Sequence, residues 1–150
     1  MPPDRVDDPE PLADVVVAGG ATRSASVRAG LSALPADAEV VLVHDAARPY
    51  ASADVWQRVL DGLATSADAV VPCVPVVDTL REVGGATVDR TRFVAVQTPQ
   101  GFAAEALRRA HAGDPEGTDD ASLVEAAGGK VLVVDGDPGN RKITTPDDLR

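Results

Sequence analysis

The sequence predicts an α/β domain in which helices cover a parallel sheet. Strand-like and helix-like segments alternate along the first half of the chain, and the strand-like segments are continuously apolar. Continuous apolar strands are typical of parallel sheets that are buried on both faces. The 150 residues suffice for one domain with a core, and only 3% are aromatic, so we expect a core of Val, Leu and Ala.

The first half of the chain should supply three strands and two helices. We expect strands at 15–17, 39–43 and 69–74. One helix should run from an N-cap at Ser24 to about Leu34, and another should begin at Ser52. Serine is a favourable N-cap residue, and apolar residues recur at helical spacing after each of these two serines.

The second half begins with a hairpin. Two short β-prone segments flank a Gly-Gly turn at 84–85, and we expect them to form a β-arm over about 76–96 that leaves the main sheet. An isolated hairpin is marginal in water, so another subunit is a natural partner for its apolar face. After it we expect helices over 103–110 and from an N-cap at Thr118 to about 127, strands over 130–134 and 141–144, and a helix start at 145–146.

Charge and composition argue against several classes of function. The formal net charge of −10 disfavours non-specific nucleic-acid binding, so we expect no nucleic-acid partner. The chain has no apolar run long enough to span a membrane and no signal-peptide pattern, so we expect a cytoplasmic protein without a membrane partner. The single cysteine, Cys73, has apolar neighbours, which predicts a buried thiol and no disulfide framework.

Polar residues at the end of the strand at 39–43 are the first candidates for a functional site. Ligands of open parallel sheets bind at the carboxyl ends of the strands, where Asp45 and Arg48 follow. Asp45 could bind a sugar hydroxyl or a metal, and Arg48 a phosphate. Alternatively, the two residues form a local pair that orders the loop. His44, beside them, is predicted to be a structural residue, and Lys142 is either a surface charge or a residue that faces a cleft.

Other polar segments are less informative. The Gly-rich turn at 18–30 precedes a helix N-terminus that favours anions, but it matches no phosphate-binding motif. Asp119 and Asp120 stand at a helix start, where the helix dipole explains them. The sequence contains no nucleophile elbow, no His/Cys cluster with metal-ligand spacing and no paired-carboxylate signature.

Five segments, taken in order, resemble one family. They are VVVAGGATRSASVRAGL, VLVHDAARP, PVVDTLREV, VDRTRFVAVQTPQGF and TDDASLVEAAGGKVLVVDGDPGNRKITTPDDL. From about Val15 to Leu149 the chain resembles the 2-C-methyl-D-erythritol 4-phosphate cytidylyltransferases of the non-mevalonate isoprenoid pathway. The resemblance implies a Rossmann-like nucleotidyltransferase sheet with a protruding β-arm, and a homodimer whose arms clasp. It also implies CTP and methylerythritol phosphate as substrates, and Mg²⁺ held mainly by the CTP phosphates.

The resemblance further implies roles for individual residues. Gly20, Ser26, Asp45 and Ala46 would contact the nucleotide. The acceptor would be bound by Asp45, Arg48, Thr79, Arg90 and Lys142, with Thr79 and Arg90 reaching the partner subunit's site. Arg90 and Lys142 would position the attacking phosphate and are the expected catalytic residues. Ala21 departs from the family, in which many relatives carry a polar or acidic residue beside the base.

One family feature has no counterpart before Val15. The family's Gly-rich loop, with its arginine and a following Pro-Lys pair, cradles the CTP phosphates. We therefore expect residues 1–150 to form a partial nucleotidyltransferase domain, N-terminally truncated and without the first strands, that is inactive alone. The alternatives are a ribitol-phosphate-type cytidylyltransferase, and a catalytically dead dimerisation or binding module. A receiver-like domain with Asp45 as phospho-acceptor is a further alternative, but it lacks the usual acidic pair.

Overall fold

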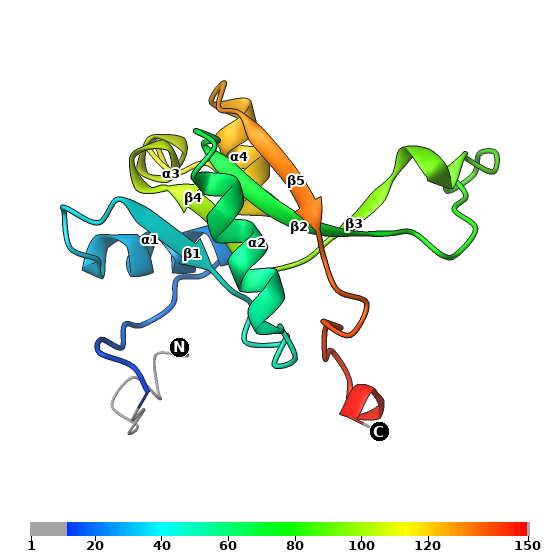
Figure 1. The fold of residues 1–150 in the computed structure, drawn as a ribbon, viewed down its shortest axis with the longest axis horizontal. Coiled ribbons are helices and arrows are strands. Elements are labelled where there is room, and N and C mark those ends of the chain that lie inside the picture. Colours follow the sequence, from blue (N-terminus) through cyan, green and yellow to red (C-terminus); the bar gives the residue numbers. More distant parts are fainter. Residues whose placement is uncertain (1–11, 150) are drawn as a thin grey trace.

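The computed structural model describes residues 12–149 and shows a five-stranded mixed sheet between helices. The strands are β1 (Val40–Val43), β2 (Ala69–Pro75), β3 (Val94–Val96), β4 (Gln100–Ala103) and β5 (Val131–Asp135). The helices are α1 (Arg23–Ala33), α2 (Ala53–Leu63), α3 (Ala104–Ala110) and α4 (Asp120–Ala126), and short 3₁₀ helices cover Arg90–Arg92 and Pro146–Leu149. The predicted α/β class is therefore confirmed (Figure 1).

The sheet is centred on β2, the longest and most deeply buried strand. β2 pairs in parallel with β5 along one side, and on the other side it pairs antiparallel with β4 at its start and with β3 at its end. β4 also pairs antiparallel with β1. The expected parallel pairing is thus confirmed for β2 and β5. β1 runs in the same direction as β2 but does not pair with it, because a short strand that the sequence pattern did not indicate, β4, lies antiparallel between them.

Two other predicted strands do not form. Residues 15–17 are not part of a strand, and Val15 is 62% exposed. Residues 141–144 make one long-range backbone hydrogen bond, from Ile143 N to Ala47 O at 2.7 Å. A strand requires a ladder of such bonds, so apolar β-branched residues alone do not produce one.

Ser52 precedes α2 as its N-cap residue, as predicted, whereas the starts of α1 and α4 differ from the prediction by one or two residues. Thr22, not Ser24, caps α1 by accepting a hydrogen bond from the third residue of the helix, and Ser24 is buried instead. Asp119, not Thr118, caps α4 in the same way. Gly128 ends α4 with a φ of +83°, as its predicted C′ position requires.

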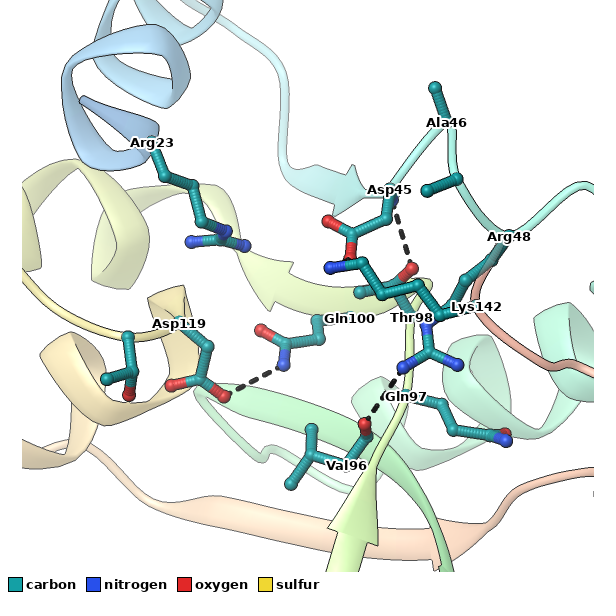
Figure 2. A pocket seen from close by; sticks show the side chains of 12 residues that line it. Arg23, Asp45, Ala46, Arg48, Val96, Gln97, Thr98, Gln100, Asp119 and Lys142 are labelled. Carbon is teal, nitrogen blue, oxygen red and sulfur yellow. Dashed lines mark hydrogen bonds and ion pairs between the residues drawn. The ribbon is translucent and has the colours of Figure 1, made fainter. Parts of the chain in front are cut away.

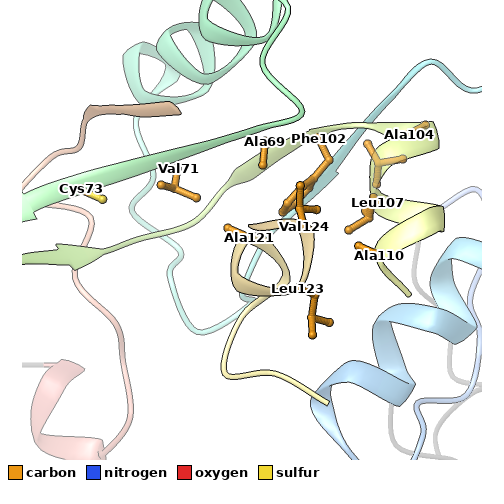
Figure 3. Packing of buried hydrophobic residues seen from close by; sticks show 11 residues of the cluster. Ala69, Val71, Cys73, Phe102, Ala104, Leu107, Ala110, Ala121, Leu123 and Val124 are labelled. Atoms are coloured by element: carbon orange, nitrogen blue, oxygen red, sulfur yellow. The ribbon is translucent and has the colours of Figure 1, made fainter. Parts of the chain in front are cut away.

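The core has one cluster on each face of the sheet. Phe102 and Leu107 are completely buried in the larger cluster, where α3 and α4 pack on β2 and β4 (Figure 3). Cys73 lies in the same cluster, which confirms that its thiol is buried. The smaller cluster is formed by Val59 of α2 with Val70 of β2, on the opposite face. None of the described helices is both long enough and apolar enough to cross a membrane.

The β-arm extends from the ends of β2 and β3. Its base is the antiparallel ladder that joins 73–75 to 94–96, and an isolated bridge pairs Arg81 with Thr87 nearer the tip. The chain between these pairs projects away from the body of the domain (Figure 1). Val77 and Val83 in the β-arm are 79% and 107% exposed. The predicted protruding arm is therefore confirmed, and two of its valines face solvent in the single chain.

Candidate active site

A pocket of about 600 Å³ opens where β1 ends and β4 begins. β1 delivers its C-terminal loop to this point, and the antiparallel β4 starts beside it, so both strands contribute residues to one rim. The residues that line the pocket are Arg23, Asp45, Ala46, Ala47, Arg48, Val96, Gln97, Thr98, Gln100, Thr118, Asp119 and Lys142 (Figure 2). Asp45, Ala46, Arg48 and Lys142, which were selected from the sequence, therefore lie together.

The centre of the pocket is an ion pair between Asp45 and Lys142. Lys142 Nζ lies 3.0 Å from Asp45 Oδ2, and the two side chains are 48% and 25% exposed. Arg48 does not pair with Asp45 through a hydrogen bond: it donates to the backbone carbonyls of Asn140 at 2.8 Å and Val96 at 3.3 Å. Burial lowers the pKa of Arg48, and the nearby Asp45 partly offsets this, but the guanidinium stays charged.

Two buried amide side chains hold the loop that carries Lys142. Gln97 donates from Nε2 to Asp137 O at 2.9 Å and accepts from Asp137 N at 3.1 Å. Asn140, which is completely buried, donates from Nδ2 to Thr98 O at 2.8 Å. These hydrogen bonds join the segment after β5 to the connection between β3 and β4. The loop that carries Lys142 is therefore held in position.

Two polar residues that sequence reasoning missed, Arg23 and Gln100, also face the pocket. Arg23, at the start of α1, forms an ion pair of 2.7 Å with the buried Asp120. Gln100 donates from Nε2 to Asp119 Oδ2 at 2.9 Å. The adjacent carboxylates of Asp119 and Asp120 therefore anchor pocket side chains, besides any interaction with the helix dipole. Only tertiary contacts reveal this, because Arg23 and Asp120 lie 97 residues apart in the sequence, and Gln100 and Asp119 lie 19 apart.

Asp120 has a second partner, His111, which is buried. His111 Nε2 lies 3.0 Å from Asp120 Oδ1, and both side chains are buried. A carboxylate that is completely buried requires such partners to offset its desolvation. The His111–Asp120–Arg23 chain thus links the core to the pocket wall.

Four other residues expected at the site do not line this pocket within one chain. Gly20 and Ser26 bond to each other at the start of α1, where Gly20 N donates to Ser26 Oγ at 3.0 Å. Thr79 and Arg90 lie on the β-arm, and Arg90 Nη1 donates to the carbonyls of Val76 and Val77. The β-arm projects away from the body of the domain (Figure 1).

The described part of the chain does not form a metal centre by itself. Among residues 12–149, no three His, Cys, Asp or Glu side chains come together in an arrangement that could hold a metal ion. Of the two carboxylates in the pocket, Asp45 pairs with Lys142 and Asp119 accepts from Gln100. A divalent cation at this site would therefore need most of its ligands from a bound molecule.

A mixed sheet covered by helices, with a polar pocket at its strand ends and a protruding arm, defines a Rossmann-like nucleotidyltransferase domain. Comparison with known proteins identifies the group within this class. The profile of the 2-C-methyl-D-erythritol 4-phosphate cytidylyltransferases (IspD) matches residues 6–150, and the chain belongs to this family.

Individual relatives support this assignment. The chain is 53% identical over 140 residues to the 2-C-methyl-D-erythritol 4-phosphate cytidylyltransferase of Nocardia farcinica, covering 90% of this chain and 60% of that protein. It is 51% identical to the bifunctional enzyme IspD/IspF of Solidesulfovibrio magneticus, covering 90% of this chain and 36% of that protein. The crystal structure of the cytidylyltransferase of Thermus thermophilus matches with a TM-score of 0.82 and 43% identity, over 93% of this chain and 75% of that chain. The chain thus spans less than two thirds of these curated relatives.

Proposed function

We propose that the protein transfers a cytidylyl group from CTP to 2-C-methyl-D-erythritol 4-phosphate and releases pyrophosphate. The observation that carries this proposal is the Asp45–Lys142 pair, set beside Arg48 and Arg23 in one pocket. Cationic side chains suit phosphate groups, and a carboxylate suits the hydroxyls of a polyol. A substrate that carries both kinds of group matches this pocket, and the relatives that share the fold are named for such a reaction.

The chemistry requires two phosphates to approach each other. An oxygen of the acceptor phosphate forms a bond to the α-phosphorus of CTP, and the bond from that phosphorus to the bridging oxygen breaks, so that pyrophosphate leaves. Lys142, held by Asp45, reduces the repulsion between the two anions and orients the attacking phosphate. A divalent cation such as Mg²⁺, held mainly by the CTP phosphates, would neutralise further charge.

The remaining site residues belong to this proposal. Gly20, Ser26 and Ala46 contact the cytidine, and Asp45 binds hydroxyls of the ribose and of the acceptor. Thr79 and Arg90 reach the acceptor phosphate in the site of a second copy, because the β-arm of a homodimer crosses to its partner. The exposed valines of the β-arm support this arrangement, since burying them against another subunit is favourable. The protein acts in the cytoplasm.

The test is acceptor-dependent pyrophosphate release from CTP by this domain together with the family's Gly-rich phosphate loop, since we expect residues 1–150 to be inactive alone. Methylerythritol phosphate should support release, and ribitol 5-phosphate should support much less. A preference for ribitol phosphate would replace the proposed substrate by the other polyol. Binding of methylerythritol phosphate without release of pyrophosphate would favour a binding module. The absence of both binding and release would contradict the proposal.

A further inference from the structure

We propose that His44 is a positioning residue that sets the direction of the Thr98 hydroxyl, so that Thr98 meets the substrate only as a hydrogen-bond acceptor. This inference rests on the proposed function for the identity of the substrate, but its geometry is independent of it. His44 follows β1 directly and is half-buried beside the pocket, while Thr98 is 5% exposed and lines the pocket.

Both ring nitrogens of His44 have a partner. Nε2 lies 3.0 Å from the carbonyl oxygen of Arg48, and Nδ1 lies 3.0 Å from Thr98 Oγ1. The ring also packs on Trp56 of α2, with the two ring centroids 5.0 Å apart. His44 is therefore held from three sides, and one of its contacts reaches a pocket side chain.

The partners fix the tautomer of the neutral ring. A carbonyl oxygen can only accept, so Nε2 must carry the proton and donate to Arg48 O. Nδ1 then has no proton and can only accept. The hydrogen bond between Nδ1 and Thr98 Oγ1 consequently takes its proton from the threonine hydroxyl.

This tautomer leaves the Thr98 hydroxyl with one lone pair that can still accept a hydrogen bond. Its hydroxyl proton is directed to His44, and one of its two lone pairs accepts from the backbone N–H of Asp45 at 3.0 Å (Figure 2). The remaining lone pair can accept from a substrate hydroxyl. A phosphate oxygen offers no proton and would meet a lone pair, so Thr98 favours the polyol part of the substrate over its phosphate.

The tautomer can be measured without any ligand. Histidines occur only at positions 44 and 111, so nitrogen NMR of the imidazoles at about pH 8, where a free imidazole is neutral, gives two separable sets of signals. We expect His44 to carry its proton on Nε2, and Thr98→Val to shift the Nδ1 resonance. A proton on Nδ1, or an Nδ1 signal indifferent to Thr98→Val, would overturn the proposal.

The consequence for binding is tested by a double-mutant cycle. Calorimetry with methylerythritol phosphate should show His44→Phe and Thr98→Val each weakening binding about 5-fold, the effect of one hydrogen bond. Thr98→Ser, which keeps the hydroxyl, should bind within about 2-fold of the wild type. The double variant should bind no more weakly than Thr98→Val alone, because His44 acts through that hydroxyl.

The outcomes separate the two proposals. Multiplicative losses in the double variant, or unchanged affinity in His44→Phe, would refute the role of His44. Absence of any binding to the wild-type protein would instead refute the proposed function, and the imidazole spectrum would still decide the tautomer. That spectrum is recorded on the wild-type chain, so the tautomer of His44 can be determined even if His44→Phe does not fold.

Discussion

Replacing Lys142 by alanine should separate stability from ligand binding. The Asp45–Lys142 pair has an N–O distance of 3.0 Å, and its side chains are 48% and 25% exposed. Exposed pairs of this kind contribute about 0.2–1 kcal/mol, so the free energy of unfolding should fall by no more than about 1 kcal/mol. A charge-assisted hydrogen bond to the acceptor phosphate is stronger, and its loss should weaken methylerythritol phosphate binding about 10–100-fold.

The only other lysine, Lys130, provides a matched control. Lys130→Ala changes the net charge equally, and the hydrogen bonds that join Lys130 to Asp68 and Ala69 use its backbone, which alanine retains. Denaturant unfolding and calorimetry on both variants complete the comparison. The reasoning fails if Lys142→Ala loses more than about 2 kcal/mol of stability, or if it binds the acceptor as well as Lys130→Ala does.

Two further predictions concern the scaffold. Gly101→Ala would place a methyl group 2.5 Å from Val59 Cγ1, so thermal or denaturant unfolding should show that the free energy of unfolding falls by about 1–3 kcal/mol. Gly30→Ala is the control, because no atom lies within 4 Å of its new methyl group, and it should not destabilise the protein. Equal effects of the two variants would contradict the packing argument. Hydrogen bonds from the N–H and hydroxyl groups of residues 144 and 145 lower the pKa of Asp148 to about 2. Because the pKa of Asp148 is depressed in the folded state, its ionised carboxylate stabilises the fold fully at a pH above the pKa of a free aspartate, about 3.9, and this stabilisation is lost as the pH falls towards 2. An NMR titration of the Asp148 carboxyl with a midpoint near 3.9 would contradict this prediction.

Apolar runs were sufficient to predict the two strands that pair in parallel. β2 and β5 pair in parallel as expected, because their side chains fill the core clusters on both sides of the sheet. The strand β4 could not be predicted in this way. Its residues, QGFA, have no β-branched run, and they become a strand because the backbones of β1 and β2 offer hydrogen bonds on either side.

Residues of the candidate site could be predicted from the sequence where they closely follow a predicted strand. Asp45 and Arg48 stand directly after β1, and both line the pocket. Arg23 was missed because its role depends on an ion pair with Asp120, 97 residues further along the chain. His44 was expected to be a structural residue, and only the distances to Arg48 O and Thr98 Oγ1 reveal which groups it orients.

The central claim is that the pocket around Asp45, Thr98 and Lys142 receives the acceptor alcohol phosphate. The most direct measurement is amide chemical-shift mapping of the 150-residue chain during titration with methylerythritol phosphate. The account predicts saturable shifts at residues 45–48, 97–100 and 140–143, which surround the pocket. Saturable shifts confined to other segments, or no shifts at all, would contradict it.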